Sequence, residues 1–338
     1  MQRTRGRLAA SILIALLVPV ASAGAATTTT AAKSKTPAVK VETKQVKGSM
    51  KLYLPDAFFV NHDAVMVPNR AIHVRGVVWP FVHGQKVTLK ASIGSHVIGT
   101  FHSWIYPSKN GRYGKFEESF RTSMTGNVTV VAAHAKTAAM KGFGAERHYS
   151  VLSETAGFGS TGQFVQLIQQ RLAALHFYIP QTGVYDQGTG LAIDAYHRLL
   201  GWGVYQTLDA RTVQYLLNGW GQFKVRFPSQ GQHAEGDLSD QLLALINGSK
   251  VYAIYPISSG KPSTPTVLGD FHVYSKDPGY LPDGMYFSNF FTGGYAIHGY
   301  NPAPDYPASH GCMRLPIVDA ISVYNWLQIG NGVDTYYG

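Results

Sequence analysis

The spacing of apolar residues changes twice along the 338-residue chain, and this change constrains the fold more than any other feature. Over residues 50–153 apolar and polar positions alternate, which is the two-residue period of half-buried strands. Over residues 157–219 the period becomes helical, and from residue 222 to 338 strand-like runs return. A chain of this length exceeds a single hydrophobic core. We therefore expect a multidomain protein, mainly β with a small α domain.

The first β-rich segment, residues 50–153, predicts several short strands. Val, Leu and Ala alternate with Lys and Thr over residues 86–91, and dipeptides such as Asn110-Gly111 and Gly126-Asn127 mark turns between such runs. Short strands of this spacing without a helical period favour an immunoglobulin-like (Ig-like) β-sandwich.

The middle segment, residues 157–219, predicts three short helices. Apolar stripes run through Val165, Ile168 and Leu172 and again through residues 191–199. A turn over residues 181–186 should lead into the second helix near Asp186, and a third short helix should follow Asp209. On the stripes alone, the segment could equally be a generic helical bundle.

The N-terminus resembles a secretory signal over residues 1–26. Arg3, Arg5 and Arg7 are followed by an apolar run over residues 8–20 and by small residues suited to cleavage. An uncleaved membrane anchor is the alternative, but the run is short for spanning a bilayer. Residues 27–49, rich in Thr, Ala and Lys, predict a flexible linker.

Most of the net charge of +10 belongs to these N-terminal segments. Without the signal and the lysine-rich linker, about +3 remains for the folded part, which is too little for a nucleic-acid footprint. We expect an exported protein, secreted to the cell wall or extracytoplasmic space, with no nucleic-acid partner. Once the signal is cleaved, no stable membrane anchor is expected.

Cys312 is the only cysteine of the chain. Exported proteins that use disulfides carry paired cysteines, and a single one cannot form an intramolecular bridge. Cys312 is therefore a buried inert residue, an intermolecular link or a reactive thiol. A lone cysteine is more often a small buried hydrophobic residue than a nucleophile.

The surroundings of Cys312 favour the nucleophile. A thiol reacts as its thiolate and needs a base to ionise it, and His298, at the end of a strand-like run, is the candidate general base and acid. The imidazole needs an orienting acceptor, as in other nucleophile–base pairs. The backbone carbonyl of Gly299 is the nearest candidate, and Asp305 is the alternative.

An acyl-transfer site also needs N–H groups directed at the developing oxyanion. The turn at Gly311 allows the backbone amides of His310, Gly311 and Cys312 to converge. Zinc binding by His298, His310 and Cys312 is the alternative, although their spacing does not support it. Arg314 either binds a carboxylate, steadies the loop or is a surface cation.

At these residues the chain is similar to a known family. The segment from residue 230 to 338 resembles the L,D-transpeptidase catalytic domain of the YkuD family, whose His-Gly pair and Ser/Thr-His-Gly-Cys-hydrophobe-Arg/Asn block match His298-Gly299 and residues 309–314. The resemblance implies a mixed-β catalytic domain, here set at residues 222–338. It also implies substrate contacts by Ser309, Arg314, Met285 and Phe287.

Residues 157–219 resemble the small three-helix peptidoglycan-binding domain. The residues that carry this second resemblance are Val165, Gln169, Leu172, Gly183, Tyr185, Asp186, Thr189 and Ala192.

Together the resemblances imply a cell-wall enzyme. Cys312 would attack the third residue of a peptidoglycan tetrapeptide stem, release D-alanine and pass the acyl group to a second stem as a 3→3 cross-link. Water as acceptor would make the same site a carboxypeptidase, and a non-catalytic wall-binding protein is the alternative from another class. Stem peptides are the expected partners, carbapenem-type β-lactams the expected inhibitors, and no cofactor or metal is expected.

Overall fold

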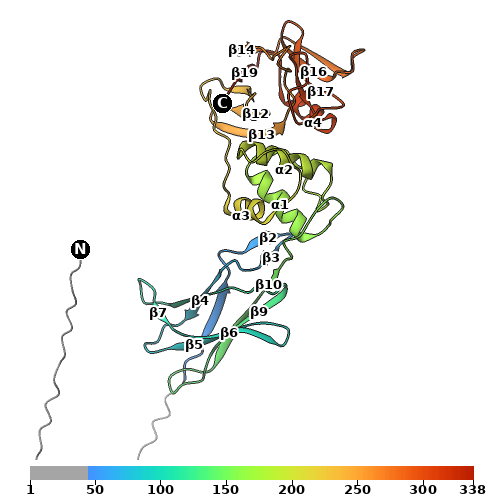
Figure 1. Ribbon diagram of the computed structural model, residues 1–338. Coiled ribbons are helices and arrows are strands. Elements are labelled where there is room, and N and C mark those ends of the chain that lie inside the picture. Colours follow the sequence, from blue (N-terminus) through green and yellow to red (C-terminus); the bar gives the residue numbers. More distant parts are fainter. Residues whose placement is uncertain (1–44) are drawn as a thin grey trace, which may run out of the picture. The chain divides into compact units, whose positions relative to one another are not determined.

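The computed structural model describes residues 45–338 (Figure 1). The predicted signal peptide and most of the predicted linker lie outside these residues. The linker was expected to end at residue 49, yet Val46 already pairs with Met140 and the first strand begins at Ser49. Within residues 45–338 no helix has the length and apolar character needed to cross a membrane.

The first β-rich segment forms two sheets that share one hydrophobic core. Alternate residues of the strands, such as Val74 and Val78 of one sheet and Val128 and Val130 of the other, are fully buried between them. This is a β-sandwich, and its Ig-like character stays a prediction. The four-stranded sheet has the order β1 (Ser49–Tyr53), β4 (Ile72–Trp79), β8 (Gly114–Phe120), β7 (Tyr106–Pro107); the six-stranded sheet has the order β2 (Phe58–Val60), β3 (Asp63–Met66), β10 (Phe143–Val151), β9 (Gly126–His134), β5 (Lys86–Ile93), β6 (His96–Trp104).

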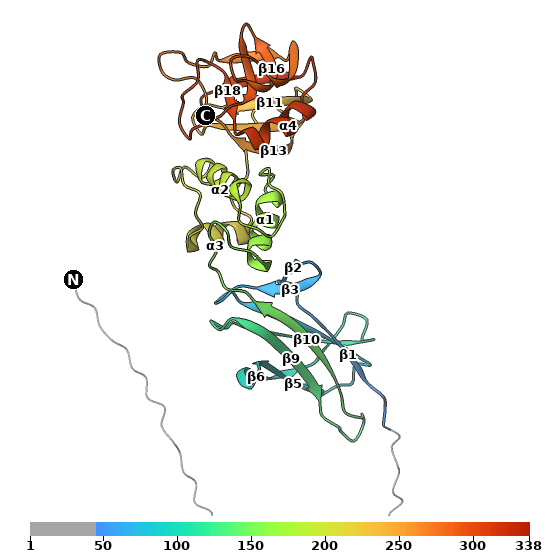
Figure 2. The same ribbon diagram turned by 90° about the vertical axis from the view of Figure 1, so that its right-hand side faces the viewer.

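Three helices follow: α1 (Gln163–Ala174), α2 (Gln187–Leu199) and α3 (Ala210–Asn218) (Figure 2). α2 and α3 begin close to the predicted positions. Asp186 and Asp209 are their N-caps, and each carboxylate accepts from the backbone N–H three residues on. The helices are short, so their stability depends on the packing of their apolar faces.

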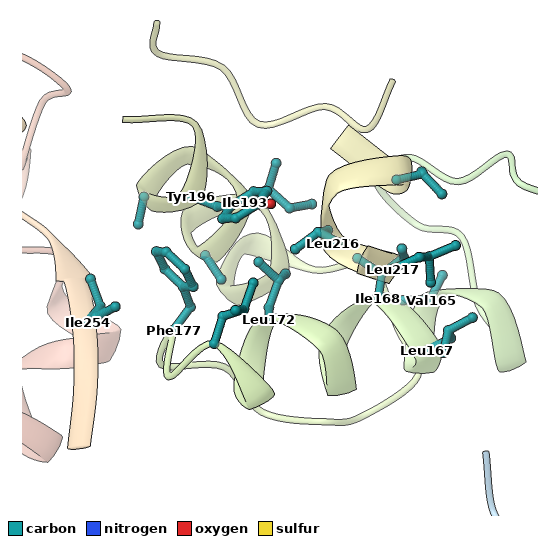
Figure 3. Packing of buried hydrophobic residues seen from close by; sticks show 14 of the residues in the cluster. Val165, Leu167, Ile168, Leu172, Phe177, Ile193, Tyr196, Leu216, Leu217 and Ile254 are labelled. Carbon is teal, nitrogen blue, oxygen red and sulfur yellow. The ribbon is translucent and has the colours of Figure 1, made fainter. Parts of the chain in front are cut away.

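The core of the helical segment extends to the next sheet. Leu172, Tyr196 and Leu216 pack together, and Phe177 lies on the side facing Ile254 (Figure 3). The backbone after α1 also pairs with the edge of that sheet: Ile254 N–H donates to His176 O at 2.8 Å, and Tyr178 N–H donates to Ile254 O at 3.0 Å. Apolar packing and backbone pairing thus join the helices to the C-terminal segment.

The C-terminal segment contains two sheets and one helix around a third core. β11 runs parallel to β19, and β17 runs parallel to β18, whereas the other pairs are antiparallel. The five-stranded sheet has the order β13 (Lys250–Pro256), β12 (Leu242–Asn247), β11 (Gln232–Asp237), β19 (Gly332–Tyr336), β14 (Gly269–His272); the four-stranded sheet has the order β15 (Ser275–Tyr280), β16 (Tyr286–Thr292), β17 (Tyr295–Gly299), β18 (Met313–Leu315), and α4 (Ile317–Trp326) follows β18.

The hairpin predicted around Asn247-Gly248 is present as β12 and β13. Its turn lies one residue later than the dipeptide suggests, because Asn247 pairs with Lys250 and leaves Gly248 and Ser249 as the two loop residues. Gly248 has a φ of 61°, which a residue without a Cβ adopts at little cost.

The cap of α3 gives a prediction for local stability. Asp209 Oδ1 accepts from both the backbone N–H (2.6 Å) and the hydroxyl (2.7 Å) of Thr212. We expect Asp209→Ala to weaken α3 by about 1 kcal/mol, seen as a roughly fivefold loss of hydrogen-exchange protection of its amides. Asp209→Asn, which keeps an acceptor oxygen, is the matched control. Equal protection in the alanine and asparagine variants would contradict the role of the cap.

Candidate active site

The parallel pair β17–β18 brings the predicted nucleophile and base to one face of a sheet. Ile297 pairs with Met313 and His298 pairs with Arg314, so Cys312, directly before β18, lies beside Ala296. Side chains alternate between faces along a strand. His298 therefore points to the same side as Cys312 and Arg314, while the side chains of Ile297 and Met313 enter the core on the other side.

His298 is buried, with 2% of its surface exposed, and its ring is held in one orientation. Nδ1–H donates to the carbonyl of Gly299 at 2.9 Å, which leaves Nε2 as the acceptor nitrogen of a neutral ring. Burial lowers the pKa of His298 to about 4. The ring is thus neutral at pH 7, as a general base must be. Asp305, the alternative orienting group, lines a separate hollow beside α2.

The Cys312 thiol is also neutral at rest. Ala296 N–H donates to Sγ at 3.4 Å, and the S–H group is directed to the carbonyl of Gly294 at 3.8 Å. Burial raises the pKa of Cys312 above that of a free thiol, and the backbone N–H of Ala296 opposes the rise. Among the hydrogen bonds of residues 45–338, none joins the His298 ring to Sγ. The predicted role of His298, as the base that takes the thiol proton during attack, stays a prediction.

The turn before Cys312 is braced by Ser309. Ser309 is fully buried, and its Oγ accepts from Gly311 N–H at 3.0 Å while donating to Cys312 O at 2.6 Å. The Ser309 side chain is thus bonded within its own loop, and the Gly311 amide already has an acceptor. The substrate contact of Ser309 and the oxyanion role of Gly311 stay predictions. Within the described chain, the amides of His310 and Cys312 have no acceptor.

Gly311 is required by the conformation of this turn. Its φ is 121°, a region that side-chain-bearing residues rarely adopt. A Cβ at this position would also lie 1.9 Å from the ring of Tyr295 on β17. The glycine therefore lets the turn lie directly against β17, the strand that carries His298.

Arg314 steadies the site by stacking. Its guanidinium carbon lies 4.0 Å from the ring centroid of Tyr300, and Nη1 donates weakly to Ala308 O at 3.5 Å. Tyr300 meets the His298 ring edge to face, with centroids 5.8 Å apart. Nε of Arg314 is buried without a partner within the described chain. The loop-steadying interpretation of Arg314 thus has contacts, and its substrate contact stays a prediction.

The other two predicted substrate residues lie on or beside β16. Met285 is buried, with 9% exposed. Phe287 packs edge to face on Tyr324 of α4, with centroids 5.0 Å apart. This contact explains the position of Phe287 by packing alone, and the substrate roles of both residues stay predictions.

A strand-like strap beside the catalytic turn was not predicted as part of the site. Ser258 N–H and C=O pair with Arg314 at 2.9 Å, and Ser259 O accepts from the amides of Ala308 and Ser309, also at 2.9 Å. The strap ends at Lys261, whose Nζ lies 3.3 Å from His310 Nε2. A Ser-Ser-Gly-Lys run in a loop gives no sign of this pairing, because the partner lies about fifty residues later in the chain.

Arg198 of α2 holds the near end of the strap. Its Nη2 lies 2.6 Å from Asp194 Oδ2, and its Nη1 donates to the carbonyls of Gln241 (3.2 Å) and Ile257 (3.0 Å). The side chains of Arg198 and Asp194 are both buried. Ile257 directly precedes Ser258, so a helix outside the predicted catalytic domain is tied to the backbone that supports the catalytic turn.

Within residues 45–338, no group of three His, Cys, Asp or Glu side chains is placed to hold a metal ion. His310, part of the zinc alternative, has its ring beside Lys261 instead.

The chain is similar to known proteins of one family. Residues 231–334 match the family model of YkuD, the L,D-transpeptidase catalytic domain. A solved L,D-transpeptidase from Xylanimonas cellulosilytica (its residues 123–326) is 31% identical, with 54% of this chain and 97% of that chain covered and a TM-score of 0.49. The catalytic domain of the Enterococcus faecium enzyme, solved free and acylated by ertapenem, is 25% identical over 32% of this chain and 98% of that one, with TM-scores of 0.29 and 0.27. No curated protein matches.

The family-model match covers the block that contains His298 and Cys312, and the 31% identity extends over nearly the whole of the Xylanimonas relative. The chain therefore belongs to the L,D-transpeptidases with a YkuD catalytic domain, and it is an enzyme of that class.

The lowered pKa of His298 gives a pH prediction. A general base must be neutral to accept a proton. The fraction of molecules with a neutral His298 therefore falls only as the pH drops through about 4, well below the pKa of a free imidazole. We expect the imidazole signals of His298, assigned by comparison with His298→Gln, to titrate near pH 4 in NMR spectra of the folded protein. A midpoint above pH 6 would contradict the burial argument.

Arg198→Met gives the third prediction. Removing the guanidinium leaves Asp194 buried without its partner, and frees the carbonyls of Gln241 and Ile257. We expect slower acylation of Cys312 at saturating substrate, because the strap under the catalytic turn loosens. The double variant Asp194→Leu/Arg198→Met removes both charges and separates lost stability from lost positioning. Full acylation rates in both folded variants would show that Arg198 only stabilises the fold.

Proposed function

We propose that this enzyme forms 3→3 cross-links in peptidoglycan through a thioester on Cys312. The observation that carries the proposal is the common face of β17 and β18, where a neutral His298 with its Nδ1 bound to Gly299 lies on the same side as the only thiol of the chain. A neutral base beside a neutral thiol suits acyl transfer, because one proton can pass between them as the bond to carbon forms.

In the first half-reaction, Sγ of Cys312 attacks the carbonyl carbon of the third stem residue. His298 Nε2 takes the thiol proton and returns it to the departing amine, so that D-alanine leaves as the S–C bond replaces the C–N bond. The free amides of Cys312 and His310 are the proposed donors to the oxyanion. Charge then develops on the oxyanion and on the His298 ring only while the bound substrate excludes water from Cys312 and His298.

In the second half-reaction, the side-chain amine of the third residue on a neighbouring stem attacks the thioester. His298 takes the proton of that amine and gives it back to sulfur as the S–C bond breaks. The new amide is the 3→3 cross-link. If water takes the place of the amine, the same steps release a free carboxylate.

Two further parts of the proposal concern how the enzyme reaches its substrate. Residues 1–26 act as a secretory signal and place the enzyme outside the cytoplasm, where peptidoglycan lies. The helices α1–α3 act as a peptidoglycan-binding module close to the catalytic segment. Their Gln169 is buried, with Nε2 donating to Val184 O and Thr189 Oγ1 at 2.9 Å, so this residue of the binding-domain pattern supports the fold of the module.

The fourth prediction tests the nucleophile. The Enterococcus faecium relative has been solved acylated by ertapenem. We expect meropenem to add one covalent mass to this protein, and none to Cys312→Ala, because the chain has no second thiol. His298→Gln, which keeps an acceptor but cannot hold a second proton, should slow the addition at least about a hundredfold. Unchanged labelling of Cys312→Ala would disprove the thioester.

The products then distinguish the possible reactions of the same thiol. Incubation with tetrapeptide-containing muropeptides should give cross-linked dimers and free D-alanine. Free D-alanine with tripeptides and no dimers would identify a carboxypeptidase. Neither product from a protein that still binds peptidoglycan would identify a wall-binding protein without activity.

A further inference from the structure

The outer face of the four-stranded sheet of the sandwich carries a groove with no assigned role. A hollow of about 530 Å³ opens on this face, and a second one of about 670 Å³ is lined also by residues of β2, β3 and β10 of the six-stranded sheet. Tyr53 and Arg75 line both hollows, so the two adjoin, and together they form the groove. The groove includes Tyr106 of β7 at one end, and Phe59 of β2 and Arg147 of β10 at the other.

The strand register arranges the side chains of this groove in rows. Tyr53, Arg75 and Glu117 stand directly opposite one another across β1, β4 and β8. In the next row, Lys115 of β8 stands opposite Tyr106 of β7. Directly paired residues share a face. The sheet therefore presents a tyrosine at each edge, with charged side chains and Val77 between them.

The aromatic rings of the groove are exposed without an evident partner in the fold. The exposed fractions are 45% for Tyr53, 60% for Phe59 and 65% for Tyr106. By contrast, the exposed Trp104 on the other sheet is covered by Lys86, whose Nζ lies 4.0 Å from the ring. An aromatic ring offers an apolar face on which the C–H groups of a sugar ring can stack, and a hydroxyl at its edge.

Both arginines of the groove have a hydrogen-bond partner in the free protein. Arg75 Nε donates to Glu117 at 3.0 Å, and Arg147 Nε donates to Leu52 O at 2.9 Å. Planar groups held in this way can exchange hydrogen bonds with hydroxyl and acetamido groups at a small entropic cost.

The charges of the groove are balanced, which argues against an anionic polymer as the ligand. An anionic polymer would need an excess of cations along its path. The groove instead has three cations and three acids, namely Arg75, Lys115, Arg147, Asp63, Glu117 and Glu146.

From these observations we propose that the sandwich binds a glycan strand of N-acetylated sugars along this groove, with Tyr53 and Tyr106 as stacking platforms. Two adjoining hollows with stacking rings at separate places fit a linear polymer better than a small compact ligand. The backbone of peptidoglycan is such a polymer, and it stays intact while its stems react. The glycan site is separate from Cys312, so the proposal does not depend on the chemistry at that residue.

The fifth prediction uses the full chain carrying Cys312→Ala, which removes turnover. The ligand is the tetramer of N-acetylglucosamine, which is neutral and has no stem, and binding is followed by amide chemical shifts in NMR spectra. We expect the shifts to concentrate on β1, β4, β7 and β8. Tyr53→Ala and Tyr106→Ala should each weaken binding about three- to tenfold, because each removes one stacked ring.

Two controls separate stacking from other effects. Tyr106→Phe keeps the ring and should bind within about twofold of the parent, and Trp104→Ala, an exposed ring outside the groove, should leave affinity unchanged. Shifts confined to α1–α3, or equal affinities for the Tyr53, Tyr106 and Trp104 alanine variants, would overturn the proposal. Polyphosphate that shifts the same amides when the tetramer does not would assign the groove to an anionic polymer instead.

Discussion

The parallel pairing of β17 with β18 is the constraint on which the active site depends. It sets His298 beside Arg314 and puts Cys312 at the start of the neighbouring strand. A shift of one residue in this register would move His298 to the core face and expose Ile297 in its place. The register is fixed from both sides, since Ile297 and Met313 are buried in one core and Ser258 pairs with Arg314 on the other edge of β18.

The active-site turn combines strict local geometry with support from distant parts of the chain. Locally, Gly311 takes a backbone conformation that excludes a side chain, and Ser309 ties the turn together. The strap at Ser258–Ser259 holds the turn from outside, and Arg198 in turn holds the strap. A buried arginine–carboxylate pair adds little net stability by itself. Here the pair orients the Arg198 guanidinium, which holds the Ile257 carbonyl in place. Ile257 precedes the strap, so the pair also helps to position the catalytic turn.

Much of the fold could be predicted from local signals, and parts of the site could not. The caps at Asp186 and Asp209, the hairpin after Asn247 and the alternation over residues 86–91 are short-range patterns with a direct physical cause. The His-Gly and Ser-His-Gly-Cys motifs likewise identify the active site, because they contain the residue types that acyl transfer requires. The hydrogen bond of the Gly311 amide depends on the exact conformation of the turn. The strap is held by pairings between residues far apart in the sequence. No local spacing encodes those contacts, so the bonded state of the Gly311 amide and the positions of Lys261 and Arg198 beside the site are visible only in the structure.

The resting protonation of the site has a consequence for the reactivity of the Cys312 thiol toward oxidants. Oxidants attack thiolates far faster than thiols, and susceptibility rises with exposure. Burial raises the pKa of Cys312 and lowers that of His298, so both disfavour the ion pair until a substrate arrives. In the proposed mechanism the proton moves only as Sγ bonds to carbon, when the proposed oxyanion donors can balance the new charge. A neutral resting pair thereby protects the single cysteine and still allows the proposed acyl transfer, whereas a permanent thiolate in the same position would react faster with oxidants.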